Sequence, residues 1–419
     1  MTQRIPCKVG GCERQILPAT AKDTGGMCMP CHLGWGHPDR KPTMPAQVDR
    51  FAGVDDPVEI LVRHFDAPKP DGTVYLDPPE PVHAYFERLT PAEQERLRDA
   101  AVDLIARGIR HGEQLAIAIA CQTSAEVRPV QLALLDQERL LAPAAFAGAA
   151  ADVRDRLLAR LAVADRRELW AVLEALAWCR DEVVVARFAG WRATPPPWWT
   201  RFGGELCEVT HRAGWELDER GACRALTTDR CYELVERPDD GAPGAVGDAA
   251  GDGAAEQAGV GVTVRNGQAC PSCGNPVYDL LRVRERAGVL AVPLCPACLY
   301  HVGPQRGVFD DAGRSRLLAP DEGADGGQQY DPLPEDALRR GRRRPPRWAI
   351  EWGAAPASQL GGHPTWVQSS EYPSCPTCRR TMRFVGQLDT EDLELGMEGF
   401  HYAFACRSCR TTAAVFQCS

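Results

Sequence analysis

The chain has 419 residues, of which 44% are apolar and 25% are charged, and its formal net charge at pH 7 is −9. This composition is typical of a globular protein, and the length favours about two to four domains over a single core. The negative charge argues against a general affinity for nucleic-acid phosphates, although it leaves room for a local basic patch.

The eighteen cysteines bear on both the cellular compartment and metal binding. The opening MTQRIPCKVGGC has no apolar run like that of a secretory leader, and aliphatic runs such as LAIAIA at 115–120 are too short to span a bilayer. We therefore expect a cytoplasmic protein, in which thiols stay reduced. So many cysteines in a reducing compartment indicate metal binding rather than disulfides.

Residues 1–45 contain two close cysteine pairs, each beside glycines that let the backbone bring two thiolates together. Four thiolates on two such turns match the tetrahedral preference of zinc, and a segment with almost no core needs the metal to fold. We expect a zinc knuckle here. His32 and His37 are alternative ligands, and a segment without metal is the other interpretation. The four cysteines of this first set are Cys7, Cys12, Cys28 and Cys31.

Residues 84–235 have the apolar periodicity of helices and clear start signals. Thr90 and Glu93 have the spacing of a capping box ahead of one helix. Asp165 and Asp181 are placed to cap two more helices. Short amphipathic helices joined by short turns are typical of helical-repeat stacks of the HEAT type. Because no strict period is present, an irregular helical domain is the alternative interpretation.

The rest of the chain changes character twice. Residues 237–262 are acidic, rich in glycine and alanine and almost free of large apolar side chains, which indicates a flexible linker. Residues 263–419 combine paired cysteines, aromatic residues and short β-type runs. The predicted fold class is therefore multidomain α+β, with an N-terminal zinc knuckle, a HEAT-like helical middle and a β-rich, zinc-bearing C-terminal domain.

The C-terminal domain contains four more C-x2-C pairs. LLRVRERAGVLAVPL separates the first two and predicts the two arms of a hairpin, as in a zinc ribbon, while FHYAFAC before the last pair predicts a strand. Pairs that recur in twos favour metal over a redox motif, which needs a strand followed by a helix. The sequence leaves open which pairs combine. The second set is Cys270, Cys273, Cys295 and Cys298, and the third is Cys375, Cys378, Cys406 and Cys409.

Catalysis has little support in the sequence. If cysteine supplies all four ligands of each site, no coordination position remains for an activated water, so the expected zinc ions, about three per chain, are structural. The sequence contains no Walker loop, no G-x-S-x-G and no H-E-x-x-H motif. We therefore expect a protein that is not an enzyme.

Two further segments carry candidate binding residues. LRRGRRRPPRW at 338–348 is the strongest basic run, and we interpret it as a solvated loop, with a segment that binds phosphates or bases as the alternative. GGHPTWVQ at 361–368 predicts a corner of a β domain, with a ligand pocket as the alternative. The candidate residues are Arg339, Arg340, Arg342, Arg343, Arg344, His363, Trp366, Gln368 and Gln387.

The C-terminal region resembles a known family. QLGGHPTWVQ at 359–368, Met382 and FVGQLD at 384–389 are similar to motifs of the YwqG-like family of bacterial domains. The resemblance covers about residues 263–419 and implies a β-rich fold of unknown biochemical function, with members often found near toxin genes. That setting implies immunity-type roles. The cysteine pairs depart from the family pattern and imply a zinc-bearing branch, and the family offers no agreed catalytic residues.

The sequence thus predicts a zinc-stabilised, non-catalytic protein that binds another protein, with toxin neutralisation as one form of this role. The first alternative is a zinc-ribbon protein that binds nucleic acid through the arginine run and the N-terminal knuckle. The second alternative is an enzyme with a pocket near His363 and Gln368. No membrane partner is expected.

Overall fold

The computed structural model describes residues 4–9, 12, 14–32, 47–66, 74–109, 111–237, 260–285, 288–299, 303–320, 332–350, 357–393 and 398–418. The predicted linker at 237–262 falls almost wholly outside these ranges. The chain divides into two compact units, one made of residues 1–52 and 68–77 and the other of residues 53–67 and 78–419. None of the helices in the described ranges has the length and apolar character needed to cross a membrane.

The first unit is built from short elements around its cysteines. They are β1 (Ile5–Pro6), β2 (Gln15–Ile16), α1 (Pro18–Asp23), α2 (Met29–His32), β3 (Gln47–Val48) and β4 (Val74–Tyr75). β1 and β2 pair antiparallel, and β3 and β4 pair parallel. The buried cluster around the cysteines consists of Cys7, Ile16 and Cys28. Apolar burial on this scale stabilises a fold only weakly, so the unit depends on its cysteines.

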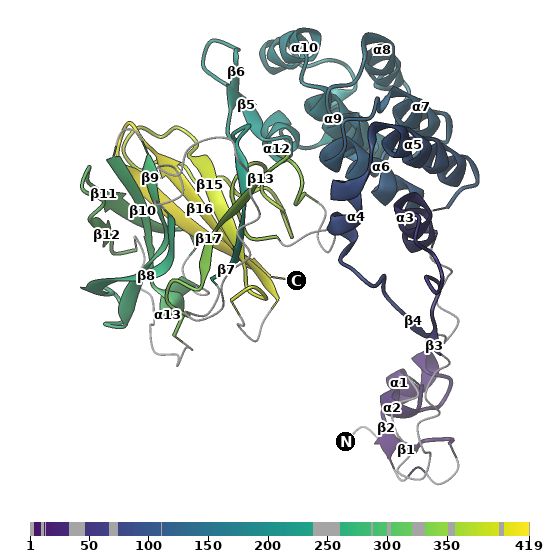
Figure 1. The fold of residues 1–419 in the computed structure, drawn as a ribbon, viewed down its shortest axis with the longest axis horizontal. Helices are drawn as coiled ribbons and strands as arrows, with labels where there is room; N and C mark the ends of the chain where they lie inside the picture. The colour runs from purple at the N-terminus through teal and green to yellow at the C-terminus, as the bar shows by residue number, and fades with distance from the viewer. Residues whose placement is uncertain are drawn as a thin grey trace. The chain divides into compact units, whose positions relative to one another are not determined.

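The second unit opens with a helical region (Figure 1). Its helices pack apolar stripes inward, and side chains such as Leu97, Leu173 and Phe188 are fully buried. The elements are α3 (Pro57–Phe65), α4 (Val82–Arg88), α5 (Pro91–Ala106), α6 (His111–Gln122), α7 (Arg128–Asp136), η1 (Pro143–Phe146), α8 (Ala151–Arg160), α9 (Arg166–Cys179), α10 (Glu182–Ala193), α11 (Trp199–Phe202) and α12 (Leu206–Arg212).

The predicted helix starts are confirmed. At the start of α5, Thr90 Oγ1 accepts a hydrogen bond from the N–H of Glu93 at 3.3 Å, and the Glu93 carboxylate accepts one from the N–H of Thr90 at 2.8 Å. Asp165 and Asp181 cap α9 and α10 by accepting first-turn N–H groups at 2.9 and 2.8 Å. These bonds satisfy amides that the helices leave without a partner. The HEAT-type arrangement stays a prediction.

The sequence prediction made residues 84–235 mostly helical, but residues 215–217, 223–225 and 231–235 form strands. β5 (Trp215–Leu217) and β6 (Cys223–Ala225) make a hairpin, and β7 (Cys231–Glu236) joins a large sheet between β13 and β14. The indole N–H of Trp215 donates to the carbonyl of Ala177 at 2.9 Å and fastens the hairpin to α9. The partners of β7 lie more than a hundred residues further along the chain, so no local pattern predicts its pairing.

Two antiparallel sheets complete the second unit, a three-stranded one ordered β10-β9-β8 and an eight-stranded one ordered β12-β11-β17-β16-β15-β14-β7-β13. The remaining elements are β8 (Val260–Ala269), β9 (Pro276–Glu285), β10 (Gly288–Leu294), α13 (Pro296–Leu299), β11 (Gln305–Phe309), β12 (Ser315–Leu317), β13 (Leu338–Arg344), β14 (Gln359–Gly361), β15 (Arg383–Asp389), β16 (Gly399–Cys406) and β17 (Thr411–Cys418). Helices together with this large sheet confirm the predicted α+β class.

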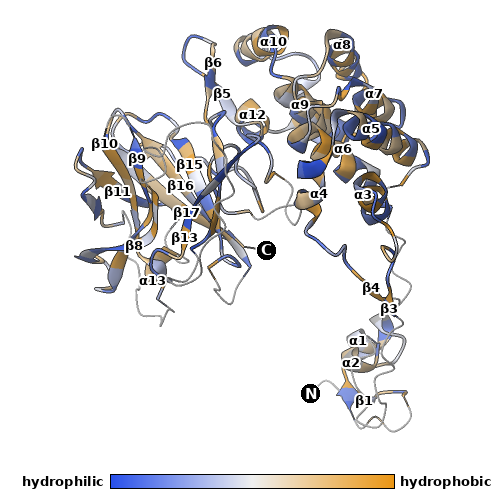
Figure 2. Ribbon diagram, in the orientation of Figure 1, coloured by the Kyte–Doolittle hydropathy of each residue, from blue (hydrophilic) through white to orange (hydrophobic). Residues whose placement is uncertain are grey.

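The two sheets share one apolar core. Leu281 of the small sheet packs with Leu388 and Ala403 of the large sheet. Because side chains alternate along a strand, Tyr402 and Phe404 point to the other face of the large sheet, where an aromatic cluster lies. Figure 2 shows apolar residues concentrated along β9, β10, β15 and β16 and hydrophilic residues along β13.

The arginine run is a strand, so its prediction as a loop is wrong. Leu338–Arg344 pair with β7 at the edge of the large sheet, with a register shift between Arg340 and Arg343. Charged side chains on an edge strand discourage pairing with another chain. The run reads as a loop because β7, its hydrogen-bonded neighbour among the described strands, lies about a hundred residues earlier in the sequence.

Two glycines with similar backbone angles, one at the end of a strand and one on an open turn of the helical region, differ in how closely other atoms surround them. Gly361 at the end of β14 has φ +72°, and a Cβ there would collide with the carbonyl oxygen of Arg230. Gly148 has φ +66°, and nothing lies within 4 Å of its Cβ position. We expect Gly148→Ala to lower the free energy of unfolding by about 1 kcal/mol, and Gly361→Ala to lower it by about 3 kcal/mol or more. Urea unfolding of both variants measures this, and equal losses would contradict the crowding at Gly361.

Candidate metal centres

The structure gathers twelve cysteines into three groups of four, and in each group the Sγ atoms all lie within 4.8 Å of one another. Each group joins its own two C-x2-C or C-x4-C pairs, so the second and third sets do not exchange pairs. The members match the sets expected from the sequence. We call them the first, second and third centres, in chain order.

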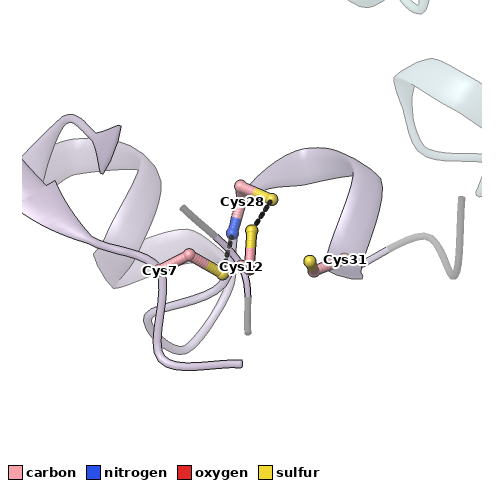
Figure 3. A group of neighbouring side chains, drawn as sticks. All are labelled: Cys7, Cys12, Cys28 and Cys31. Carbon is pink, nitrogen blue, oxygen red and sulfur yellow. Dashed lines mark hydrogen bonds between the residues drawn. The ribbon is translucent and has the colours of Figure 1, made fainter. Parts of the chain in front are cut away.

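The first centre holds the N-terminal unit together. Cys7 follows β1, Cys12 precedes β2, Cys28 precedes α2 and Cys31 lies in α2. The Sγ atoms of Cys12 and Cys28 are 3.8 Å apart, and the backbone N–H of Cys28 donates to the Sγ of Cys7 at 3.2 Å. Figure 3 shows the four side chains converging from the loops around the hairpin and from the short helix. His32 is exposed, and His37 lies outside the described residues.

The second centre joins the ends of three strands. Cys270 and Cys273 lie on the turn from β8 to β9, and Cys295 and Cys298 follow β10. The Sγ distances are 3.8 Å from Cys270 to Cys298 and 3.5 Å from Cys273 to Cys295. The side chain of Gln305 accepts from the backbone N–H of Cys295 at 2.6 Å and donates to its carbonyl at 2.8 Å. This clamp fixes the second pair against β11.

The third centre fastens a turn to the large sheet. Cys375 and Cys378 lie before β15, whereas Cys406 ends β16 and Cys409 lies in the turn to β17. The Sγ atoms of Cys378 and Cys406 are 3.7 Å apart. The N–H of Cys375, a fully buried residue, donates to the carbonyl of Arg380 at 2.9 Å and closes the turn. The centre lies beside the aromatic cluster on the outer face of the sheet.

The sulfur spacing fits a four-coordinate metal. In a regular tetrahedron, a metal–sulfur distance of about 2.3 Å separates the sulfurs by about 3.8 Å. The measured separations of 3.8, 3.8, 3.5 and 3.7 Å lie close to that value. A disulfide would bring two sulfurs to about 2.05 Å, and all eighteen cysteines are free. These residues therefore fit three metal ions per chain.

Thiol ionisation also indicates a cation. In the first centre, a hydrogen bond from the backbone N–H of Cys28 lowers the pKa of Cys7 to about 7, whereas hydrogen bonding with the Cys28 side chain raises the pKa of Cys31 to about 12. The third centre has the same split, with a pKa of about 6 for Cys375 and about 12 for Cys409. Four adjacent thiols do not all ionise, because each thiolate raises the pKa of its neighbours. A bound cation offsets this repulsion and allows all four to be thiolates.

The remaining cysteines stay apart from the centres. Cys121 and Cys179 are buried in α6 and α9, as expected of core thiols, and Cys231 is buried in β7. Cys207 and Cys223 are exposed and join no group of metal-ligating side chains in the described ranges.

The candidate residues of the C-terminal corner are occupied by structural contacts. The fully buried Gln387 accepts the N–H of Thr365 at 2.8 Å and donates to the carbonyl of Ala357 at 2.7 Å. Gln368 is exposed, and its amide donates to the carbonyl of Cys418 at 2.8 Å. These bonds fasten the GGHPTWVQ segment to the large sheet.

His363 and Trp366 belong to the same segment and are also packed. The ring of His363 is 5.2 Å from that of Trp178 in α9, and its Nε2 lies 3.2 Å from Thr227 Oγ1. Burial lowers the pKa of His363 to about 3, so the ring is neutral at physiological pH. Trp366 packs against Tyr372 at 5.2 Å between ring centres. The segment therefore joins the sheet to the helical region.

Two of the candidate arginines on β13 are ion-paired. Arg344, only 11% exposed, pairs with both Glu87 of α4 and Glu233 of β7, and Arg342 pairs with Glu87 at 3.4 Å. The N–H donors of a guanidinium between two carboxylates are occupied and its positive charge is neutralised, so it attracts a phosphate only weakly. These pairs instead connect the helical region to the sheet.

The other three candidate arginines differ from these. The guanidinium of Arg340 lies 4.6 Å from the ring centre of Tyr232, in cation–π geometry. Arg339 and Arg343 are exposed on the edge strand.

Some residues around the centres have roles that the sequence prediction missed. Asn275 donates to the Sγ of Cys273 at 3.4 Å, and Gln305 clamps Cys295. The third centre is surrounded by arginines that were not singled out. A signal for them is present in the sequence: Gly274 follows the CPSC pair, whereas Arg379 follows CPTC.

The fold and the three centres define a multidomain α+β protein with cysteine-ligated metal sites. A protein of Salmonella typhimurium, "Uncharacterized protein YpfL", is 33% identical over 445 aligned positions, which cover the whole of both chains. The chain therefore belongs to the same family as YpfL. No family model matches the chain, and no solved structure matches it.

The three centres predict the metal content of single variants. We expect Cys28→Ser, Cys273→Ser and Cys378→Ser each to remove one of about three ions per chain, because a hydroxyl binds the metal much more weakly than a thiolate. Cys223→Ser, at an exposed position outside the centres, should leave the content unchanged. Elemental analysis after dialysis measures this, and equal metal content in all four variants would contradict the assignment.

Proposed function

We propose that the chain is a zinc-stabilised, non-catalytic binding protein and that its partner is another protein. The observation that supports this is the closure of the centres: among the described residues, each gathers four cysteines and no other ligand. A tetrahedral metal with four thiolates has no position for water or substrate. The three ions therefore act on stability rather than on chemistry, and the function lies in the surfaces that they hold in place.

Zinc suits these centres best among the metals. Its usual bond length to sulfur matches the sulfur separations, and structural zinc sites commonly have four cysteine ligands. Iron also binds four thiolates. Zinc has no redox chemistry of its own, which agrees with a purely structural role.

Two exposed apolar side chains support a protein partner for the helical region. Leu141 is 67% exposed and Val163 is 79% exposed, in the turns after α7 and α8. The two turns are neighbours, because Arg160 pairs with Glu138 at 3.3 Å and also with Glu168 at the start of α9. Apolar side chains in a polar surround are a common centre of a protein interface.

A toxin is the kind of partner that the resemblance to the YwqG-like family favours. That resemblance stays a prediction, and so does a role in toxin neutralisation. The resemblance and the toxin role bear on which protein is bound. The metal centres and the exposed apolar turns bear on how a protein is bound.

Metal removal tests the structural role of zinc. We expect the purified protein to contain zinc and to be colourless, and a strong chelator to lower its melting temperature and release its metal. The first unit should unfold before the second, because its apolar core is the smaller one. Elemental analysis and melting curves measure these effects. A coloured, iron-containing protein, or an unchanged melting temperature after complete zinc removal, would refute this part of the proposal.

The protein partner is tested by co-purification with the products of the genes adjacent to its own. Leu141→Asp combined with Val163→Asp should reduce recovery of a bound partner about tenfold, because charges replace the apolar centre of the contact. Val74→Asp, at a position 41% exposed in the first unit, is the control and should leave recovery unchanged. Recovery of no neighbouring gene product, or equal recovery with both variants, would count against the proposal.

A further inference from the structure

Arginines surround the third centre. Arg379 directly follows Cys378 and Arg407 directly follows Cys406, whose sulfurs are 3.7 Å apart, so the two arginines begin close together. Arg383 opens β15 and pairs with β16 opposite Ala405. The whole set is exposed, and consists of Arg379, Arg380, Arg383, Arg407 and Arg410. We call it the arginine surface.

Two of these arginines have a backbone conformation that favours glycine. Arg379 has φ +61° and Arg410 has φ +53°, each directly after the second cysteine of a C-x2-C pair. The second centre makes the same turn with Gly274 at φ +76°. An L side chain at such an angle costs free energy that glycine avoids. Other non-glycine residues of the chain, such as Arg180 at the end of α9, share this conformation, so the angle by itself assigns no role and serves here to mark two positions where glycine would be the less strained residue.

Part of the arginine surface has no acidic partner. Arg407 pairs with Glu285 and Arg410 pairs with Asp311, the latter at 2.7 Å. Arg379, Arg380 and Arg383 make no ion pair or side-chain hydrogen bond within the described residues. A divalent metal with four thiolates carries two excess negative charges. Three unpaired guanidinium groups more than balance these charges, so the surface is positive even with its metal bound.

The pKa of Arg383 reflects the positive charges around it. The pKa of Arg383 is lowered by burial and by the nearby positive charges of Arg224 and Arg407. Arg224 and Arg407 pair with Glu216 and Glu285, whereas Arg383 has no such partner within the described residues, and an unpaired guanidinium among other cations attracts an anion.

We propose that the arginine surface binds the phosphate backbone of a nucleic acid. Guanidinium groups bind phosphate oxygens in a bidentate manner, and a metal-fixed turn holds them in place before binding. The exposed side chains beside the arginines include the hydroxyls of Ser374, Thr377 and Ser408, together with Pro376. Hydroxyls also contact phosphates, whereas a protein interface needs an apolar centre.

This surface is separate from the apolar turns of the helical region, so the proposal does not depend on a protein partner. It also differs from the run on β13, where two of the arginines are bound to carboxylates. The contacts reach phosphates and not bases, so binding is independent of sequence. The negative net charge confines binding to this surface and keeps it weak at physiological salt.

The test uses the full, metal-loaded chain and a fluorescent single-stranded DNA of mixed sequence, followed by anisotropy at about 50 and 200 mM salt. We expect binding that weakens steeply with salt. Combining Arg379→Gln, Arg380→Gln and Arg383→Gln should weaken binding about tenfold or more and lower the salt slope by about two. The matched control combines Arg316→Gln, Arg339→Gln and Arg343→Gln, which removes the same charge from exposed positions on β12 and β13 and should change binding little.

Several outcomes would overturn the proposal. They are the absence of DNA binding at 50 mM salt, equal weakening in the two triple variants, and preferential binding of a polyglutamate peptide, which would indicate an acidic protein instead. Metal analysis and melting curves of each variant establish that the third centre is intact.

A single variant separates a binding role of Arg379 from a structural one. Arg379→Gly should raise the melting temperature by about 2 °C, because glycine relieves the strained turn, and should at the same time weaken DNA binding. A lower melting temperature with unchanged DNA binding would mean that the side chain stabilises the centre rather than holding a ligand.

Discussion

Four sulfur atoms within 4.8 Å of one another repel as thiolates, and a cation between them turns this repulsion into attraction. The first unit depends most on that change, because the buried cluster around its cysteines includes little apolar surface beyond Ile16. The second and third centres lie on strand ends whose sheets already share a large core. The same ligand set therefore folds one part of the chain and only fixes turns in the other.

Fixed turns connect the centres to the rest of the molecule. The third centre holds residues 375–381, which lie outside the strands, against the hairpin of β16 and β17. Gln387 and Thr365 connect the GGHPTWVQ segment to the same sheet, and the ring of His363 extends this contact to Trp178 in the helical region. Arg344, between Glu87 and Glu233, makes a second connection. Polar residues that resembled a binding site thus serve to join two layers of one unit.

Local patterns in the sequence predicted local features well. The cysteine spacings, the Thr90 capping box and the caps at Asp165 and Asp181 all depend on neighbours in the chain, and the structure contains them. Long-range pairing was not predictable. β7 finds its partners a hundred residues away, and the carboxylate partners of Arg344 come from two distant elements. The arginines at the third centre were missed because the sequence signal, an arginine where the second centre has Gly274, gains its meaning only from the positive φ that the folded turn imposes there.

The strand order also has a consequence for biosynthesis. β17, at residues 411–418, is an inner strand between β11 and β16, so the large sheet is incomplete until these residues have left the ribosome. The first centre has all its ligands once Cys31 has emerged, whereas the third waits for Cys409, 378 positions later. At about 5 to 20 residues per second, that delay is roughly 20 to 80 s. A growing chain therefore presents a complete N-terminal ligand set long before the C-terminal set exists, which allows the centres to be filled in chain order.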